Sequence, residues 1–365
     1  MTKKTTVKLD LPTNFEDGVY FDLPDSEYHS EPRLSATGMK WLTTGEPMDF
    51  WARSWMNPRF VNEDTPSRIL GRAYHARILE GREAYHARFA PALDKADYPN
   101  ALFTVADLKN FLAAKGETVS NASSKSKLIN LVQQFDEHPV IWDVVKQAHA
   151  EKCANKTLLQ RDVFDNVEYA ATIVDHHPTA HKVVSGGYAE VSVFYSITVD
   201  EIDGSNMRYK IPLKARFDYL KSKAICDLKS YSNHGGLEIM KAIYKAIASY
   251  KYHIQVASYL QAWDAARFLI QDSQITGTAK QRIFLQEAAK HDKAFWFLFQ
   301  QSGAAPSPRV CEFPIPSMAF DSAKVIIEHA QIQFARNYEF HGSEPWIADS
   351  CVERLDDNEF PVWMF

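Results

Sequence analysis

The sequence predicts an α/β domain with a central mixed sheet. β-Branched and aromatic residues are concentrated at 188–199, which indicates a strand. Two further apolar runs, 209–217 and 224–228, flank the short polar turn 221–223 and indicate a pair of strands joined as a hairpin. Segments with helical spacing of apolar residues precede and follow these strands. This order of helices, strands, helices, strands and a closing helix is typical of a mixed sheet covered by helices.

The composition is that of a globular chain with a substantial core. The chain has 365 residues, of which 45% are hydrophobic and 24% are charged, enough for one large domain or two smaller ones. Its formal net charge is −5, so a polyanionic partner would have to be held by a local basic cluster.

The pattern of cysteines and the lengths of the apolar runs indicate the cellular compartment in which the protein is expected. The four cysteines are scattered without a Cys-x-x-Cys pair, which fits a reducing cytosol without a disulfide framework or a zinc ribbon. The start of the chain lacks the apolar core of a signal peptide, and no run approaches the roughly 18 apolar residues of a membrane span. We therefore expect a cytoplasmic protein.

The N-terminal third is predicted to be mainly helical. Residues 1–33 are expected to be irregular because three prolines interrupt them. Ser35 has the N-cap residue type for a helix that runs into the apolar stripe after it. A second helix is predicted at 67–81, with Gly81 at its C-cap position.

Residues 101–135 are interpreted as an inserted module. Two short helices, 104–116 and 123–132, are separated by an extended polar connection at 117–122. A further helical stretch is expected from 140 to about 160. The later elements are predicted as a helical block at 236–270, strand-like runs at 282–287, 295–299 and 310–315, a closing helix at 319–338, and an irregular aromatic tail from 346 to 365.

The hairpin holds the most informative residues. Asp227 and Lys229 are two positions apart on the second predicted strand, so their side chains project from the same face. Asp218 lies on the preceding strand and can come alongside. Two carboxylates and an ammonium on one face can bind a hard divalent cation and handle phosphate chemistry. The alternative is a solvated strand face with a weak ion pair; the apolar residues before Asp227 favour a buried strand, where charges need partners or a metal.

Other candidate residues have ordinary structural explanations as well. His75 follows Gly71 by one helical turn, and could be either a ligand or a helix-surface histidine. Glu190 stands in an otherwise apolar strand, and could be either an active-site acid or a surface residue. Gln255 and Tyr259 share one face of the following helix.

Tyrosines and lysines alternate around that helix, at Tyr244, Tyr250, Tyr252, Lys241, Lys245 and Lys251. Aromatic residues interleaved with basic ones suit a nucleic-acid backbone, although a tyrosine stripe is more often core than functional.

Taken in order, Gly71-x-x-x-His75, Asp218, Asp227-x-Lys229 and Gln255-x-x-x-Tyr259 resemble the motifs of RecB-type nucleases in the PD-(D/E)XK superfamily. Within that group the chain is most similar to the RecE-type exonucleases (exodeoxyribonuclease VIII) of phage and prophage recombination systems. The resemblance spans about 20–340. It implies a mixed sheet flanked by helices and metal-dependent hydrolysis of phosphodiester bonds.

Carried over residue by residue, the resemblance implies that His75, Asp218, Asp227 and the backbone carbonyl of Leu228 bind the metal. Magnesium is the expected ion, and a histidine ligand would also accommodate manganese. Lys229 would orient the attacking water and offset the transition-state charge, and Glu190 matches an acidic catalytic position less securely. Candidate DNA contacts are Arg216, Gln255, Tyr259, Lys125 and Lys127. The cysteine spacing does not match the iron–sulfur cluster of some relatives, so no cluster is expected.

On this interpretation the chain divides into an N-terminal helical part (1–100), an insertion (101–135), a catalytic core (136–345) and an aromatic tail (346–365). The insertion resembles a SAP-like helix–extended–helix unit, which would touch duplex DNA; the alternative is a surface insertion without a DNA role. The resemblance further implies a homo-oligomeric ring, with a tetramer favoured, and a single-strand annealing partner. The tail aromatics Trp346, Phe360, Trp363 and Phe365 could form subunit contacts or pack back onto the core.

The expected function is an exodeoxyribonuclease that degrades linear double-stranded DNA and leaves a single-stranded 3′ tail for recombination. Its 5′-to-3′ polarity rests on the resemblance alone. One alternative is a structure-specific or single-strand nuclease on the same core, such as a repair or CRISPR-associated enzyme. Another is a non-catalytic DNA-binding protein, against which the intact acidic and basic residues argue.

Overall fold

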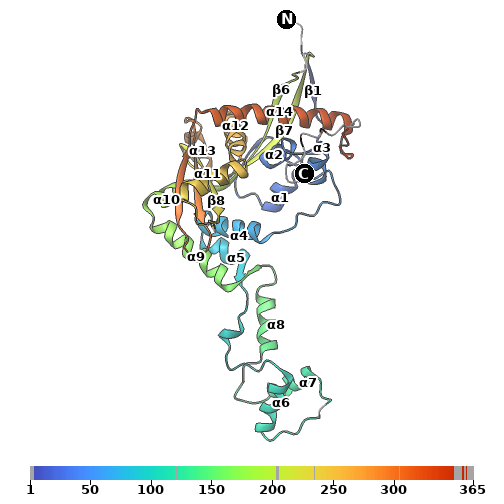
Figure 1. Cartoon of the computed structure of the whole chain (residues 1–365), viewed down its shortest axis with the longest axis vertical. Coiled ribbons are helices and arrows are strands. Elements are labelled where there is room, and N and C mark those ends of the chain that lie inside the picture. The colour runs from blue at the N-terminus through green and yellow to red at the C-terminus, as the bar shows by residue number, and fades with distance from the viewer. Residues whose placement is uncertain are drawn as a thin grey trace. The chain divides into compact units, whose positions relative to one another are not determined.

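The computed structural model describes two compact units (Figure 1). The described residues are 4–120, 122–202, 205–233, 235–303, 305–348, 356 and 359. The first unit comprises Met1–Ile69, His177–Ser302 and Pro308–Phe365, and the second comprises Leu70–His176 and Gly303–Ser307.

The first unit is built on a mixed sheet of nine strands among the described residues. The strand order is β11-β10-β8-β7-β6-β2-β9, with β1 and β3 also pairing with β7. The β6–β7 and β7–β8 pairs are antiparallel and β8–β10 is parallel, so the predicted mixed sheet is confirmed. The strands are β1 (Thr5–Lys8), β2 (Gly18–Tyr20), β3 (Leu34–Ser35), β6 (Tyr188–Asp200), β7 (Met207–Leu220), β8 (Ala224–Tyr231), β9 (Ile275–Thr276), β10 (Ala294–Gln301) and β11 (Pro308–Phe313).

The helices of the first unit cover this sheet. Helix α12 lies along β6 and β7 and packs against α2 and α14 (Figure 1). The helices are α1 (Asp25–Ser30), α2 (Ala36–Leu42), α3 (Pro47–Ala52), α10 (Pro178–Val183), α11 (Ile239–Ser249), α12 (Tyr252–Gln271), α13 (Ala279–Ala288) and α14 (Met318–His341), while α4 (Pro66–Tyr74) begins here and ends in the second unit. The predicted cap of α2 is confirmed, because the Ser35 hydroxyl accepts a hydrogen bond from the Gly38 amide at 3.2 Å.

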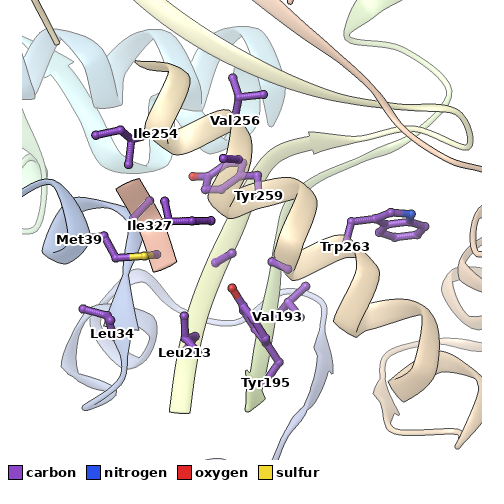
Figure 2. Packing of buried hydrophobic residues seen from close by; sticks show 14 of the residues in the cluster. Leu34, Met39, Val193, Tyr195, Leu213, Ile254, Val256, Tyr259, Trp263 and Ile327 are labelled. Carbon is purple, nitrogen blue, oxygen red and sulfur yellow. The ribbon is translucent and has the colours of Figure 1, made fainter. Parts of the chain in front are cut away.

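The core of this unit lies between α12 and the sheet (Figure 2). The Tyr259 and Trp263 rings of α12 lie 5.5 and 6.4 Å from the Phe217 ring of β7, in the same cluster as the fully buried Val193 and Leu213. Helix α14 adds Ile327 to the same cluster. Burial of such side chains stabilises the fold by about 1.5–3 kcal/mol each, so α12 and the strands that carry the candidate site are held rigidly together.

The second unit is mainly helical and has a small core of its own. The two helices predicted at 104–116 and 123–132 are present as α6 (Val105–Ala114) and α7 (Lys125–Val132), and they bury Leu108, Leu112, Leu128 and Val132 against Ile141. The elements after α4 are η1, a π-helix (His75–Leu79), α5 (Arg82–Arg88), β4 (Phe89–Pro91), the 3₁₀ turn η2 (Lys95–Asp97), α6 (Val105–Ala114), α7 (Lys125–Val132), α8 (Trp142–Lys152), β5 (Thr157–Leu159) and α9 (Arg161–His176).

Three expectations about local structure are wrong. Residues 1–33 are not irregular throughout, because β1, β2 and α1 form there and β1 gains its hydrogen bonds from the distant strand β7. The strand expected at 282–287 is part of α13, where Thr278 and Gln281 form a capping box and Leu285 is buried. Gly81 does not end a regular helix: the helix first widens into η1, and Gly81, at φ +100°, leads into α5.

Trp346 is a core residue. Its indole is fully buried and stacks on Phe50 with ring centroids 5.0 Å apart, and its N–H donates to the Gly342 carbonyl at 3.1 Å. It is therefore not available as a subunit contact, and the expectation of packing onto the core holds for this residue. The other tail aromatics, Phe360, Trp363 and Phe365, lie outside the described residues. Among the described residues no helix has the length and apolar character of a membrane span.

Candidate active site

Three acidic residues lie at one level of three adjacent strands in the first unit. The flanking pairs are Ala189↔Tyr219 and Val191↔Phe217 between β6 and β7, and Tyr219↔Cys226 and Leu220↔Ile225 between β7 and β8. These pairs place Glu190 opposite Asp218, and Asp218 opposite Asp227. The predicted approach of the two aspartates is thus a consequence of strand register.

Strands β7 and β8 stop pairing just where this acidic row begins. The backbones of the two strands pair at only two positions. Beyond these, a side chain replaces the backbone acceptor: the Asp218 Oδ2 atom accepts a hydrogen bond from the Leu228 amide at 2.9 Å. Asp218 is 7% exposed and Asp227 is fully buried. The expectation that β8 is buried on both faces around Asp227 is confirmed.

The backbone is irregular at the same level. Along β6 and β7 every second side chain belongs to the core, as expected for a regular strand. The alternation is interrupted once in each, where the next core residue comes three positions later, from Phe217 to Leu220 on β7 and from Tyr188 to Val191 on β6. Glu190 lies within the interruption on β6 and has φ +53°, in the left-handed region that side chains other than glycine rarely adopt. Such a conformation costs on the order of 1–3 kcal/mol and is concentrated at functional sites.

Glu190 and Asp218 form an acidic pair suited to a cation. One carboxylate oxygen of each lies within 4.8 Å of the other. Like charges directly opposite one another on neighbouring strands are destabilising. A hard divalent cation, which prefers carboxylate oxygens, would convert this repulsion into attraction. The donor set therefore fits a hard divalent cation.

Asp227 is held between two partners. Its Oδ2 atom lies 2.5 Å from the Lys229 ammonium, and its Oδ1 atom accepts a hydrogen bond from Gln255 Nε2 at 2.7 Å. Burial disfavours the charged form of Lys229, but the Asp227 and Asp218 carboxylates outweigh burial and raise the pKa of this ammonium above its ordinary value. The two residues of the Asp-x-Lys motif thus share one face, as predicted.

Tyr259 and Arg216 are both buried beside this row. The Tyr259 ring packs against Phe217 at 5.5 Å between centroids, and burial together with the Asp218 and Asp227 charges raises the pKa of its phenol well above the ordinary value. The Arg216 guanidinium donates to Ser192 Oγ at 2.8 Å, Asp25 Oδ1 at 2.6 Å and the Leu23 carbonyl at 2.9 Å. These bonds direct Arg216 into the protein.

Sequence reasoning missed Lys40. It lies on α2, and its ammonium is 5.4 Å from the centroid of the Tyr252 ring, while the Lys229 ammonium is 5.2 Å from the same centroid. Burial lowers the pKa of Lys40 to about 8, and the positive charge of Lys229 contributes. No local pattern identifies this lysine, because it reaches the site only through the packing of α2 on α12.

The remaining candidates belong to the second unit. His75 is the first residue of η1, and a π-helical turn is frequently found at a functional site. Arg77, on the same turn, donates to Glu168 of α9 at 2.7 Å and so fixes η1 within this unit. A Cβ at Gly71 would meet nothing within 4 Å, so no close packing neighbour accounts for this glycine.

The two lysines proposed for DNA contact differ in their surroundings. Lys125 forms an ion pair with Asp143 at 2.5 Å and is half-buried. Lys127 is exposed on α7. Lys127 is thus the better placed of the two to meet a ligand from solvent.

The sheet, the acidic row and the adjacent lysine define a PD-(D/E)XK nuclease domain. The chain belongs to the family described as "PDDEXK-like domain of unknown function (DUF3799)", whose model matches residues 54–284. No curated protein matches the chain. Among solved structures it is similar to the crystal structure of a "Putative exonuclease" from Eubacterium rectale, with 13% identity, a TM-score of 0.46, and coverage of 93% of this chain and 97% of the other.

Replacing Glu190 with Gln should separate charge repulsion from structural support. Without metal, the variant should be more stable by about 0.2–1 kcal/mol, because one of two facing charges is removed. The stabilisation that Mg²⁺ confers on the wild type should shrink, because a ligand that binds only the folded state stabilises it in proportion to its affinity. Urea unfolding in EDTA and in Mg²⁺ measures both effects.

A loss of stability in EDTA would instead show that the Glu190 carboxylate acts mainly as a partner of Arg216, whose guanidinium lies 3.9 Å away.

Proposed function

We propose that this chain is a divalent-metal-dependent exodeoxyribonuclease that degrades linear double-stranded DNA from the 5′ end and leaves a 3′ single-stranded tail for recombination. The observation that carries the proposal is the row of Glu190, Asp218 and Asp227 with Lys229 paired to its last member. The polarity and the recombination role come from the resemblance to RecE-type exonucleases.

Following the resemblance, His75, Asp218, Asp227 and the Leu228 carbonyl would hold the metal, and Glu190, whose carboxylate faces Asp218, is added to this set. Magnesium or manganese, when bound, lowers the pKa of a coordinated water and offsets charge on the phosphoryl oxygens. Oxygen donors suit magnesium, and the histidine extends the range to manganese.

The protein's own contribution is positioning and charge. Lys229 supplies a fixed positive charge beside the carboxylates, where it can hold the attacking water and stabilise the extra negative charge of the transition state. Gln255 fixes the orientation of Asp227, since its amide donates to the Oδ1 atom. Arg216 positions the β6–β7 region through Ser192 and Asp25, and we assign it this role in preference to a DNA contact.

The test is digestion of linear duplex labelled at either the 5′ or the 3′ end, with Mg²⁺ or with EDTA. We expect Mg²⁺-dependent release of mononucleotides, early loss of the 5′ label, and no digestion of covalently closed circular duplex. Cleavage of circular or branched DNA would favour the structure-specific alternative, and preference for single strands would favour a single-strand nuclease. DNA binding without any cleavage would favour the non-catalytic alternative.

We also propose how the protein retains its DNA substrate and how its subunits assemble. With a net charge of −5 the chain has little general attraction for DNA, so a closed ring of subunits could retain the substrate topologically. We propose such a ring, a tetramer by the resemblance, and cooperation with a single-strand annealing protein. Within the insertion, Lys127 and Lys125 are the candidate contacts to the phosphate backbone of DNA.

A further inference from the structure

An aromatic stack leads outward from the candidate site at the junction of α11 and α12. Lys251 has φ +51° and separates the two helices. The rings of Tyr250 and Tyr252, on either side of it, are stacked with centroids 5.6 Å apart and planes 22° apart. Tyr252 rests on Phe297 of β10 at 5.8 Å, whereas Tyr250 is 63% exposed. The outer ring of an anchored stack therefore faces solvent.

The inner ring of this stack gathers positive charge. The Lys229 and Lys40 ammonium groups both lie over Tyr252. Lys229 is paired with Asp227, whereas Lys40 has no ion pair or side-chain hydrogen bond within the described part of the chain. Burial and the Lys229 charge disfavour the charged form of Lys40, and the Asp227 carboxylate offsets them only in part, so a further anion at Lys40 would be favourable.

Packing alone does not account for both features. A half-buried tyrosine such as Tyr252 needs no exposed tyrosine stacked on its outer side, and a surface lysine needs no partly buried place near another lysine. A nucleotide supplies what each lacks, since its phosphate is an anion and its base has a flat face that stacks on aromatic rings.

We propose that Lys40 and Tyr250 form a subsite for the nucleotide next to the scissile phosphate, in which Lys40 binds the flanking phosphate and Tyr250 stacks on the base. The ligand class is an unpaired deoxynucleotide at a strand end, because a base within a duplex has no free face to offer. This inference rests on the proposed function and adds to it that the duplex end is opened before cleavage.

The test is binding of a fluorescent single-stranded oligodeoxynucleotide to the full chain in EDTA, where the metal-dependent cleavage proposed here cannot occur. Tyr250→Ala should weaken binding about 5- to 150-fold, the equivalent of about 1–3 kcal/mol for one lost base stack. Tyr250→Phe should bind like the wild type. Tyr244→Ala is the matched control, since Tyr244 is a 65% exposed tyrosine on α11, and it should leave affinity unchanged.

Lys40→Gln has a different signature. It should weaken binding and lower the slope of log affinity against log salt by about 0.7, the value for one lost phosphate contact on a single strand. Tyr250→Ala should leave that slope unchanged.

Equal effects of Tyr250→Ala and Tyr244→Ala, or an unchanged salt slope in Lys40→Gln, would overturn the subsite. Failure of the proposed function is a separate result. In that case the wild-type chain would release no nucleotides with Mg²⁺, while the Tyr250 and Lys40 variants still lost single-strand affinity in EDTA.

Discussion

Replacing Asp227 with Asn is expected to abolish phosphodiester hydrolysis, with a loss of at least about 10³-fold, because a carboxylate next to the metal is worth several kcal/mol of transition-state stabilisation. The Asn side chain keeps the shape of Asp227 and can still accept the hydrogen bond from Gln255. Single-turnover digestion of end-labelled duplex at saturating protein measures the loss. Near wild-type cleavage by this variant would show that the acidic row is not the catalytic site.

The same substitution should also cost stability. Asp227 is fully buried and paired with Lys229, so removing its charge leaves a partly buried ammonium without its partner, at a cost on the order of 3 kcal/mol. Asp218→Asn should behave differently, because it relieves the repulsion from Glu190 and can still accept from the Leu228 amide. Urea unfolding in EDTA should therefore give Asp218→Asn a larger free energy of unfolding than Asp227→Asn, although both variants lose cleavage.

Replacing Lys229 with Met is expected to lower the rate of the chemical step by roughly 10²–10³-fold, as for other lost electrostatic donors. Methionine retains most of the apolar stem that packs beside Tyr252. Affinity for duplex, measured in EDTA, should change little, because the Lys229 charge is directed at Asp227 in the protein. Lys223→Met, at an exposed position in the turn before β8, is the control for a general loss of positive charge.

A Lys229→Met variant that cleaved normally at saturation but bound DNA poorly would contradict the catalytic role and assign the lysine to substrate grip. Combining Lys229→Met with Asp227→Asn gives a further check. The pair of substitutions removes both buried charges together, so it should recover much of the stability lost by Asp227→Asn alone without recovering activity.

The parts of the candidate site that lie within a single strand or helix could be predicted from the short-range periodicity of the sequence. Asp227 and Lys229 share a face because strand side chains repeat every two residues, and Gln255 and Tyr259 share a face because helix side chains repeat about every four. Both pairs are adjacent to the acidic row in the structure. The strands and helices that carry them were predictable for the same reason.

Features that depend on distant parts of the chain could not be predicted this way. Glu190 comes opposite Asp218 only through the register of β6 and β7. Nothing in the sequence around this glutamate indicates that its φ is positive. Lys40 is brought to Tyr252 by helix packing. β1 has few apolar residues and is a strand because β7 offers it an edge. Register, packing and edge pairing are tertiary effects that override local propensity.

The hydrogen bond from the Leu228 amide to Asp218 gives one carboxylate a structural role in the backbone as well as its proposed role in the chemistry. Where β7 and β8 would otherwise continue their ladder, the strand order is held by a side chain that also belongs to the acidic row. Exchange of the Leu228 amide hydrogen with solvent therefore requires that Asp218 release it. This single proton should report on the position of the Asp218 carboxylate.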